Sequence, residues 1–187
     1  MRVLIVLSLL FSLSACATTE SKTPQSNHSA IAIELGGLDT QQANTAIFQA
    51  LLKQGYLVES VKDSGVAVQF GKHQFLLETQ LDKTGFNRIL VNRFYAVHPK
   101  VQNSDQLYIL ISSLNQQLNF AKFVVRQKGT VVQLQTAASF NLSIELEEIR
   151  KFLLWTSDGI EHVANGLPKE LGQVIKPIPV MKPKQPI

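Results

Sequence analysis

Hydrophobic positions follow a helical spacing in three separate stretches of the chain. Apolar residues recur three or four positions apart in the stretches 39–54, 105–119 and 143–166, which predicts an amphipathic helix in each. Either Asp39 or Thr40 can cap the first of these helices. The second has the most regular apolar stripe, which consists of Leu107, Leu110, Ile111, Leu114 and Leu118.

Between the first two helices the spacing changes to the alternation of apolar and polar residues that is typical of strands. This stretch runs from Tyr56 to Val97, and glycine-containing turns divide it into an antiparallel meander whose last and longest strand is Phe86 to Tyr95. Two further strands, 122–126 and 131–136, form a hairpin. The pattern predicts an α+β fold, with helices packed on one face of an antiparallel sheet and the element order α-βββ-α-ββ-α.

Both ends of the chain lack these periods. Arg2 and a short apolar run precede Leu13-Ser14-Ala15-Cys16, as in a secretory signal peptide. Residues 17–30 are small or polar and predict a flexible tether. Four of the seven prolines stand after residue 176, so we expect residues 172–187 to form an exposed, disordered tail. The folded domain is therefore expected to span residues 31–171.

The tetrapeptide that ends in the cysteine resembles the lipobox of bacterial lipoproteins. The resemblance implies that residues 1–15 are removed as a signal peptide and that Cys16 is acylated, which would hold the protein on a lipid bilayer. Ala17 stands where an aspartate would resemble an inner-membrane retention signal, so the outer membrane, on its periplasmic face, is favoured over the inner membrane. The alternative is an ordinary signal peptide that happens to contain a cysteine.

The body of the chain resembles a second family. The predicted element order, the segment Leu114 to Phe123, the hairpin after it and the long last helix are together similar to the YbjN family, over about residues 38–167. That family shares the fold of type III secretion chaperones, and its members are described as sensory-transduction regulators. The resemblance implies a chaperone-like fold that associates with an envelope protein or with a second copy of itself.

The net charge of +4 suggests nucleic-acid binding only until the charges are located. Arg2, Lys176, Lys182 and Lys184 lie near the two ends of the chain and account for the whole excess of 18 basic over 14 acidic residues. A nucleic-acid binder needs a basic face that neutralises several phosphates. The neutral body therefore argues against a nucleic-acid partner.

The sequence contains no recognisable catalytic motif. Asp158, Glu161 and His162 are close on the last predicted helix, but they do not form the H-E-x-x-H pattern of a zinc site. His73 and His98 are expected to be half-exposed strand residues without a partner. We therefore expect no enzyme activity, no metal and no cofactor. The alternative is a small ligand-sensing or hydrolytic protein, in which histidines and carboxylates converge in the folded chain.

The longest predicted strand is apolar on both of its faces. Ile89, Val91 and Tyr95 share one face, which leaves an apolar opposite face as well. One interpretation is a central strand that is covered on both sides. The other is a partner surface on the face away from the helices. The residues of that surface would be Phe86, Arg88, Leu90 and Phe94.

Overall fold

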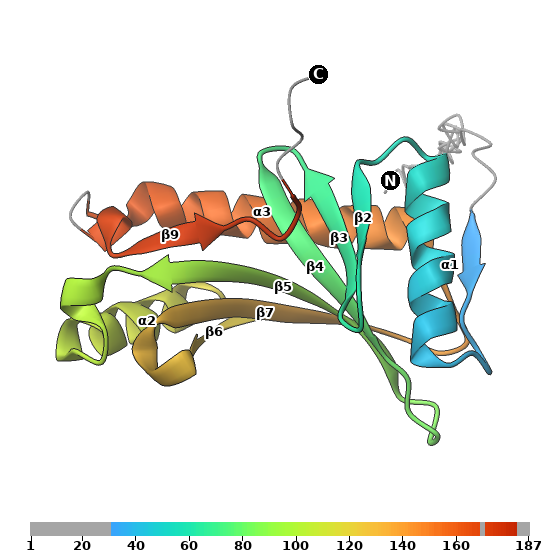
Figure 1. Cartoon of the computed structure of the whole chain (residues 1–187), viewed down its shortest axis with the longest axis horizontal. Helices are drawn as coiled ribbons and strands as arrows, with labels where there is room; N and C mark the ends of the chain where they lie inside the picture. Colours follow the sequence, from blue (N-terminus) through green and yellow to red (C-terminus); the bar gives the residue numbers. More distant parts are fainter. Residues whose placement is uncertain (1–30, 169–170, 183–187) are drawn as a thin grey trace, which may run out of the picture.

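The computed structural model describes residues 31–168 and 171–182, which form an α+β domain (Figure 1). The helices are α1 (Thr40–Lys53), α2 (Asp105–Gln117) and α3 (Leu146–Gly166). The strands are β1 (Ala32–Glu34), β2 (Val58–Val61), β3 (Gly65–Phe70), β4 (His73–Gln80), β5 (Asn87–Val97), β6 (Ala121–Arg126), β7 (Val131–Phe140), β8 (Ser143–Glu145) and β9 (Ile175–Ile178).

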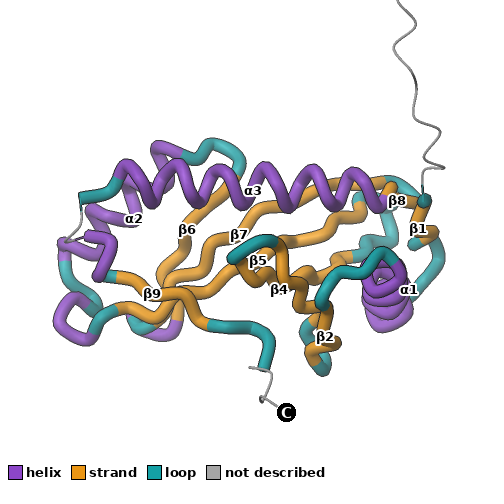
Figure 2. The backbone as a smooth tube through the Cα atoms, turned by 90° about the horizontal axis from the view of Figure 1, so that it is seen from above, coloured by secondary structure: helices purple, strands orange, loops and turns teal. Residues whose placement is uncertain are grey.

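Seven of these strands form one antiparallel sheet in the order β2-β3-β4-β5-β7-β6, with β9 attached to β5 beside β4. Helix α3 runs along the length of this sheet, with α1 at one end and α2 at the other (Figure 2). The three helices and alternate strand residues share one apolar core. Its most deeply buried members include Ile47, Leu51, Phe75, Leu77, Ile89, Leu107, Leu114, Leu134 and Leu153.

Helix α1 begins at the predicted cap, whereas α3 begins at Leu146 and not near residue 143 as expected, because residues 143–145 form β8. Asp39 accepts a hydrogen bond from the Gln42 amide at 2.8 Å, and the Gln42 side chain accepts one from the Asp39 amide at 3.0 Å, which is a complete capping box. Glu145 and Glu148 form a second capping box at the start of α3. These side chains satisfy backbone amides that the first turn of a helix leaves free.

The element order differs from the prediction in its shortest members. The meander has four strands, because the four residues of β2 pair with β3. Strands β1 and β8 form a separate ribbon of three residue pairs, centred on Ile33 and Ile144. Three residues are too few to display an alternating pattern, so this ribbon has no signal in the sequence.

The C-terminal segment contradicts the expectation of a disordered tail. Residues 175–178 form β9, which pairs Tyr95 with Pro177 and Phe94 with Ile178 on β5. Val174 and Met181 on either side of β9 are buried. A proline is tolerated here because β9 has β5 as its single strand partner in the described sheet, which makes it an edge strand. The folded domain therefore extends to residue 182, and not to 171 as expected.

The N-terminal predictions fall outside the described residues. The signal peptide 1–15, the acylation site Cys16 and the tether 16–30 all belong to that part of the chain. Within residues 31–168 and 171–182, no helix combines the length and the apolar character that crossing a membrane would require.

Candidate functional site

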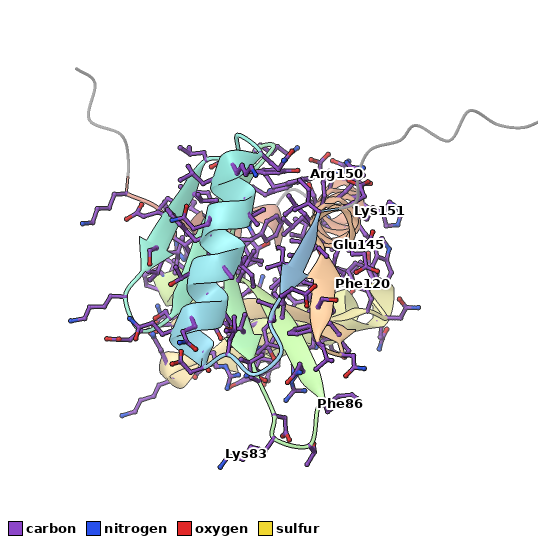
Figure 3. All side chains as sticks on the ribbon, turned by 90° about the vertical axis from the view of Figure 1, so that its right-hand side faces the viewer. Lys83, Phe86, Phe120, Glu145, Arg150 and Lys151 are labelled. Carbon is purple, nitrogen blue, oxygen red and sulfur yellow. The ribbon has the colours of Figure 1, made fainter. Side chains whose placement is uncertain are left out.

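The predicted partner surface does not form one exposed patch. Phe86 is 66% exposed and lies with Lys83 on the loop between β4 and β5, which projects away from the body of the domain (Figure 3). Arg88 is also exposed, and its Nε donates to Gln80 Oε1 at 2.7 Å. Both residues are therefore accessible, but they lie at one end of β5.

The other two residues of that surface are covered. Leu90 is only 6% exposed, and Phe94 is half-buried opposite Ile178 of β9. Leu90 shares the outer face of β5 with Asn92 and is buried there, so the expectation of an exposed Leu90 on this face is wrong. The structure supports the interpretation of a central strand that is covered on both sides.

The most unusual residue on β5 is Arg93, which the sequence analysis did not single out. It lies on the same face as Val91 and Tyr95, toward the helices, and is only 7% exposed. Arginine is rarely buried this deeply without a paired carboxylate, because removing a charge from water costs several kcal/mol (on the order of 3 or more). Among the described residues, no carboxylate lies within ion-pair distance of Arg93.

The guanidinium of Arg93 has two neighbours. Its Nη1 donates to Nδ1 of His73 on β4, and its Cζ lies 5.3 Å from the centre of the Tyr95 ring. The second contact is a cation–π interaction. Burial raises the pKa of Tyr95 to about 12, so its ring stays neutral and does not supply a counter-charge.

The hydrogen bond from Arg93 fixes the protonation of His73. Arginine can only donate, so Nδ1 of His73 accepts and the ring proton is on Nε2. Nε2 lies 3.4 Å from Glu161 Oε1, close enough for an ion pair but without the geometry of a hydrogen bond. Burial lowers the pKa of His73, and the positive charge of Arg93 lowers it further, which keeps the ring neutral near pH 7.

Glu161 connects this buried pair to the surface. Lys72 Nζ lies 3.0 Å from Glu161 Oε1; the Lys72 side chain is largely exposed to solvent, and the Glu161 side chain is 43% exposed. The hydrogen bond from Lys72 lowers the pKa of Glu161. Since Glu161 is shared with Lys72 and reaches Arg93 only through the neutral His73, it does not neutralise the buried guanidinium.

Two cavities meet at Arg93. The first, which we call the apolar cavity, has a volume of about 230 Å³ and lies between β5, α2, α3 and β9. The second, which we call the polar cleft, measures about 190 Å³ and is lined by Gln69, Lys72, Gln74 and residues 177–179. Arg93 and Pro177 line both cavities, so Arg93 lies where the two cavities adjoin.

The structure brings together only some of the titratable residues named from the sequence. His73 is buried next to Arg93 and Glu161, so the expectation of a half-exposed histidine without a partner is wrong. A histidine beside a carboxylate is what the ligand-sensing alternative requires. His98 instead accepts from the Lys100 amide at 3.3 Å and caps a short helical turn, whereas His162 is exposed. The described residues contain no group of three His, Cys, Asp or Glu that could hold a metal ion.

A signal for Arg93 was present in the sequence. Arg93 stands in the same alternating set as Ile89, Val91 and Tyr95, where the pattern predicts a core-facing side chain. A cation at such a position predicts either a buried ion pair or a ligand. The pattern could not identify its neighbours, because His73 and Glu161 come from other elements.

Comparison with known proteins provides no further guidance. No protein-family model matches the chain, and no curated protein or solved structure is significantly similar to it. The resemblances to bacterial lipoproteins and to the YbjN family therefore remain predictions, and the function has to be inferred from the geometry.

Proposed function

We propose that this protein is a lipid-anchored envelope protein whose α+β domain binds a small anionic ligand at Arg93. One observation carries the proposal: Arg93 is only 7% exposed, has no carboxylate partner among the described residues and lines two cavities. An unpaired buried charge destabilises a fold, so its presence calls for a compensating role. An anion that enters either cavity would supply the missing negative charge.

The proposed anchor rests on the lipobox resemblance at Cys16. A Cys16 that carries two or three acyl chains would hold the domain on the periplasmic face of the outer membrane, whereas one chain alone would bind only weakly and reversibly. The domain would then meet its ligand at or near the bilayer surface.

The site is better suited to binding than to catalysis. His73 is the only described histidine next to Arg93, and its Nδ1 is already occupied by the guanidinium. No Ser, Cys or Thr side chain is hydrogen-bonded to His73 in the described part of the chain. A nucleophile and a base in contact are what covalent catalysis requires.

The test compares two arginines of the same strand. Arg93→Gln removes the buried charge, and Arg88→Gln removes an exposed one. Thermal shift assays with acetate, phosphate, octanoate and chloride should show stabilisation of the parent and of Arg88→Gln by at least one of the first three anions, relative to chloride. Loss of that stabilisation in Arg93→Gln supports the proposal, and its retention contradicts it.

A second candidate function, self-association, is favoured by an exposed aromatic stack on α3. Trp155 is 52% exposed and stacks on Phe120 with ring centres 3.9 Å apart. Phe120 in turn packs on the backbone of α3, because a Cβ at Gly159 would lie 2.7 Å from its ring. Light scattering distinguishes this candidate: Trp155→Lys should reduce a dimer mass to a monomer mass, whereas Phe86→Lys should not.

A further inference from the structure

We infer that the ligand of the Arg93 site is a single-chain aliphatic carboxylate, whose headgroup pairs with Arg93 and whose tail fills the apolar cavity. This inference rests on the proposed function and names the chemical class of its ligand. It follows from three properties of the site: the composition of the cavity wall, the number of buried charges and the volume.

The cavity wall is mostly apolar. Leu114 of α2, Phe123 of β6, Ile160 and Val163 of α3 and Ile175 of β9 line it. Arg93, His73 and Tyr95 are the lining residues with a charged or polar side-chain group, and all three are at least nine-tenths buried. A pocket with this polarity fits a ligand that has one polar end and one hydrocarbon end.

The headgroup follows from the charge count. Arg93 is the one buried cation of the cavity wall, and the neutral His73 adds no second charge. One positive charge matches one negative charge, which favours a carboxylate over a doubly charged phosphate monoester. The planar guanidinium has five N–H donors, of which His73 takes one, so a carboxylate can still bind through two parallel hydrogen bonds.

The length of the tail follows from the volume. The apolar cavity of about 230 Å³ lies below the roughly 300–1,000 Å³ of pockets for drug-sized ligands. We therefore expect a medium-length chain and use octanoate as the probe. Burying each additional methylene should raise the affinity about fourfold until the cavity is full.

One wall of this cavity is formed by the edge strand β9. Ile175 and Pro177 contribute to the wall, and β9 is an edge strand that contacts β5 through four residue pairs. The helices and strands on the other sides belong to the core. Val174, immediately before β9, belongs to the same core, so β9 lies at the edge of the core and is not separate from it.

The test is calorimetric titration of the full chain carrying Cys16→Ser, which prevents acylation and removes the protein's own lipid as a competitor. The probes are octanoate, butanoate, acetate, 1-octanol and inorganic phosphate. We expect affinity to rise along the carboxylate series, and 1-octanol and acetate to bind at least tenfold more weakly than octanoate. Arg93→Gln should abolish the preference for octanoate over 1-octanol, and Arg88→Gln should retain it.

The possible failures are distinguishable. If acetate or phosphate binds as tightly as octanoate, the anion site stands and the inference about the tail is wrong. If no anion binds to the parent, the proposed function fails with it. If Arg93→Gln binds octanoate like the parent, the ligand occupies another site.

A further variant tests where the tail lies. Ile160→Phe, which fills the cavity, should weaken the binding of octanoate at least tenfold and leave the binding of acetate unchanged. An equal loss of affinity for both would overturn the placement of the tail.

Discussion

Two neighbouring polar residues on β5 point to opposite faces of the sheet, and their surroundings differ. Asn92 is fully buried on the outer face, where its Oδ1 accepts from the side-chain amides of Gln133 at 2.7 Å and Gln135 at 3.0 Å. Arg93 is buried on the helix face, where His73 is its hydrogen-bond partner among the described residues. The Oδ1 of Asn92 is thus satisfied by side chains of its own sheet, although its Nδ2 is buried without a hydrogen-bond partner in the described part of the chain, whereas Arg93 lines two cavities.

This difference indicates that buried polar side chains have two different roles in this sheet. The amides around Asn92 come from β7, the strand next to β5, so they help to fix the pairing of the two strands. The guanidinium of Arg93 fixes no such pairing, and its charge destabilises the ligand-free domain. The first arrangement stabilises the fold, and the second supports a binding site.

The largest expected effect comes from removing the wall of the Arg93 site. Deleting residues 172–187 removes the buried side chains of Val174 and Met181 together with β9, so we expect a loss of at least about 3 kcal/mol in the free energy of unfolding. Urea denaturation followed by circular dichroism measures it. Lys176→Ala, at an exposed position of β9, is the matched control and should change little. A deletion variant as stable as the parent would contradict the packing of β9.

The next largest effect concerns the side-chain amides that surround Asn92. Asn92→Leu leaves the amides of Gln133 and Gln135 without their acceptor, which should cost about 2 kcal/mol of unfolding free energy. Gln80→Leu, at an exposed position of the same face, should change it by less than about 0.5 kcal/mol. Asn92→Leu should also leave octanoate binding intact. If Asn92→Leu instead lost octanoate binding and kept its stability, Asn92 would serve binding and not the fold, which would contradict the role assigned to the outer face of the sheet.

The smallest effect is a pH dependence that His73 introduces. Its pKa is lowered in the folded state, by burial and by Arg93 and Lys72, against the opposing influence of Glu161. As pH falls below about 6.5, the unfolded chain takes up a proton that the folded chain does not, so stability falls until the lowered pKa is reached. His73→Gln should flatten this slope between pH 7 and 5, as measured by thermal unfolding. His98→Gln is the control, and an equal flattening there would exclude His73 as the origin.

Local patterns were sufficient to predict most of the fold. The helical spacing of Leu107, Leu110 and Leu114 placed α2 correctly, and the capping residue Asp39 placed the start of α1. The hairpin of β6 and β7 was also predicted near its observed bounds. Each of these elements carries its determinants within a few residues of itself.

The remaining features depend on contacts that are distant in the sequence. Prolines argue against a strand at 175–178, but the edge position beside β5 tolerates Pro177. The burial of Leu90 depends on what covers the outer face, which alternation within β5 does not specify. The side chain of Asn115 in the last turn of α2 hydrogen-bonds to both the amide and the carbonyl of Phe123 on β6.

The most direct test of the role of Arg93 measures stability and binding on the same variant. Arg93→Met removes the unpaired charge and keeps an unbranched, flexible side chain that is shorter than arginine, so we expect the ligand-free domain to gain about 1 kcal/mol in unfolding free energy. The same variant should lose octanoate binding, whereas Arg88→Met should change neither quantity appreciably. A loss of more than about 2 kcal/mol in Arg93→Met, with octanoate binding unchanged, would show that Arg93 serves the fold and would contradict a ligand site.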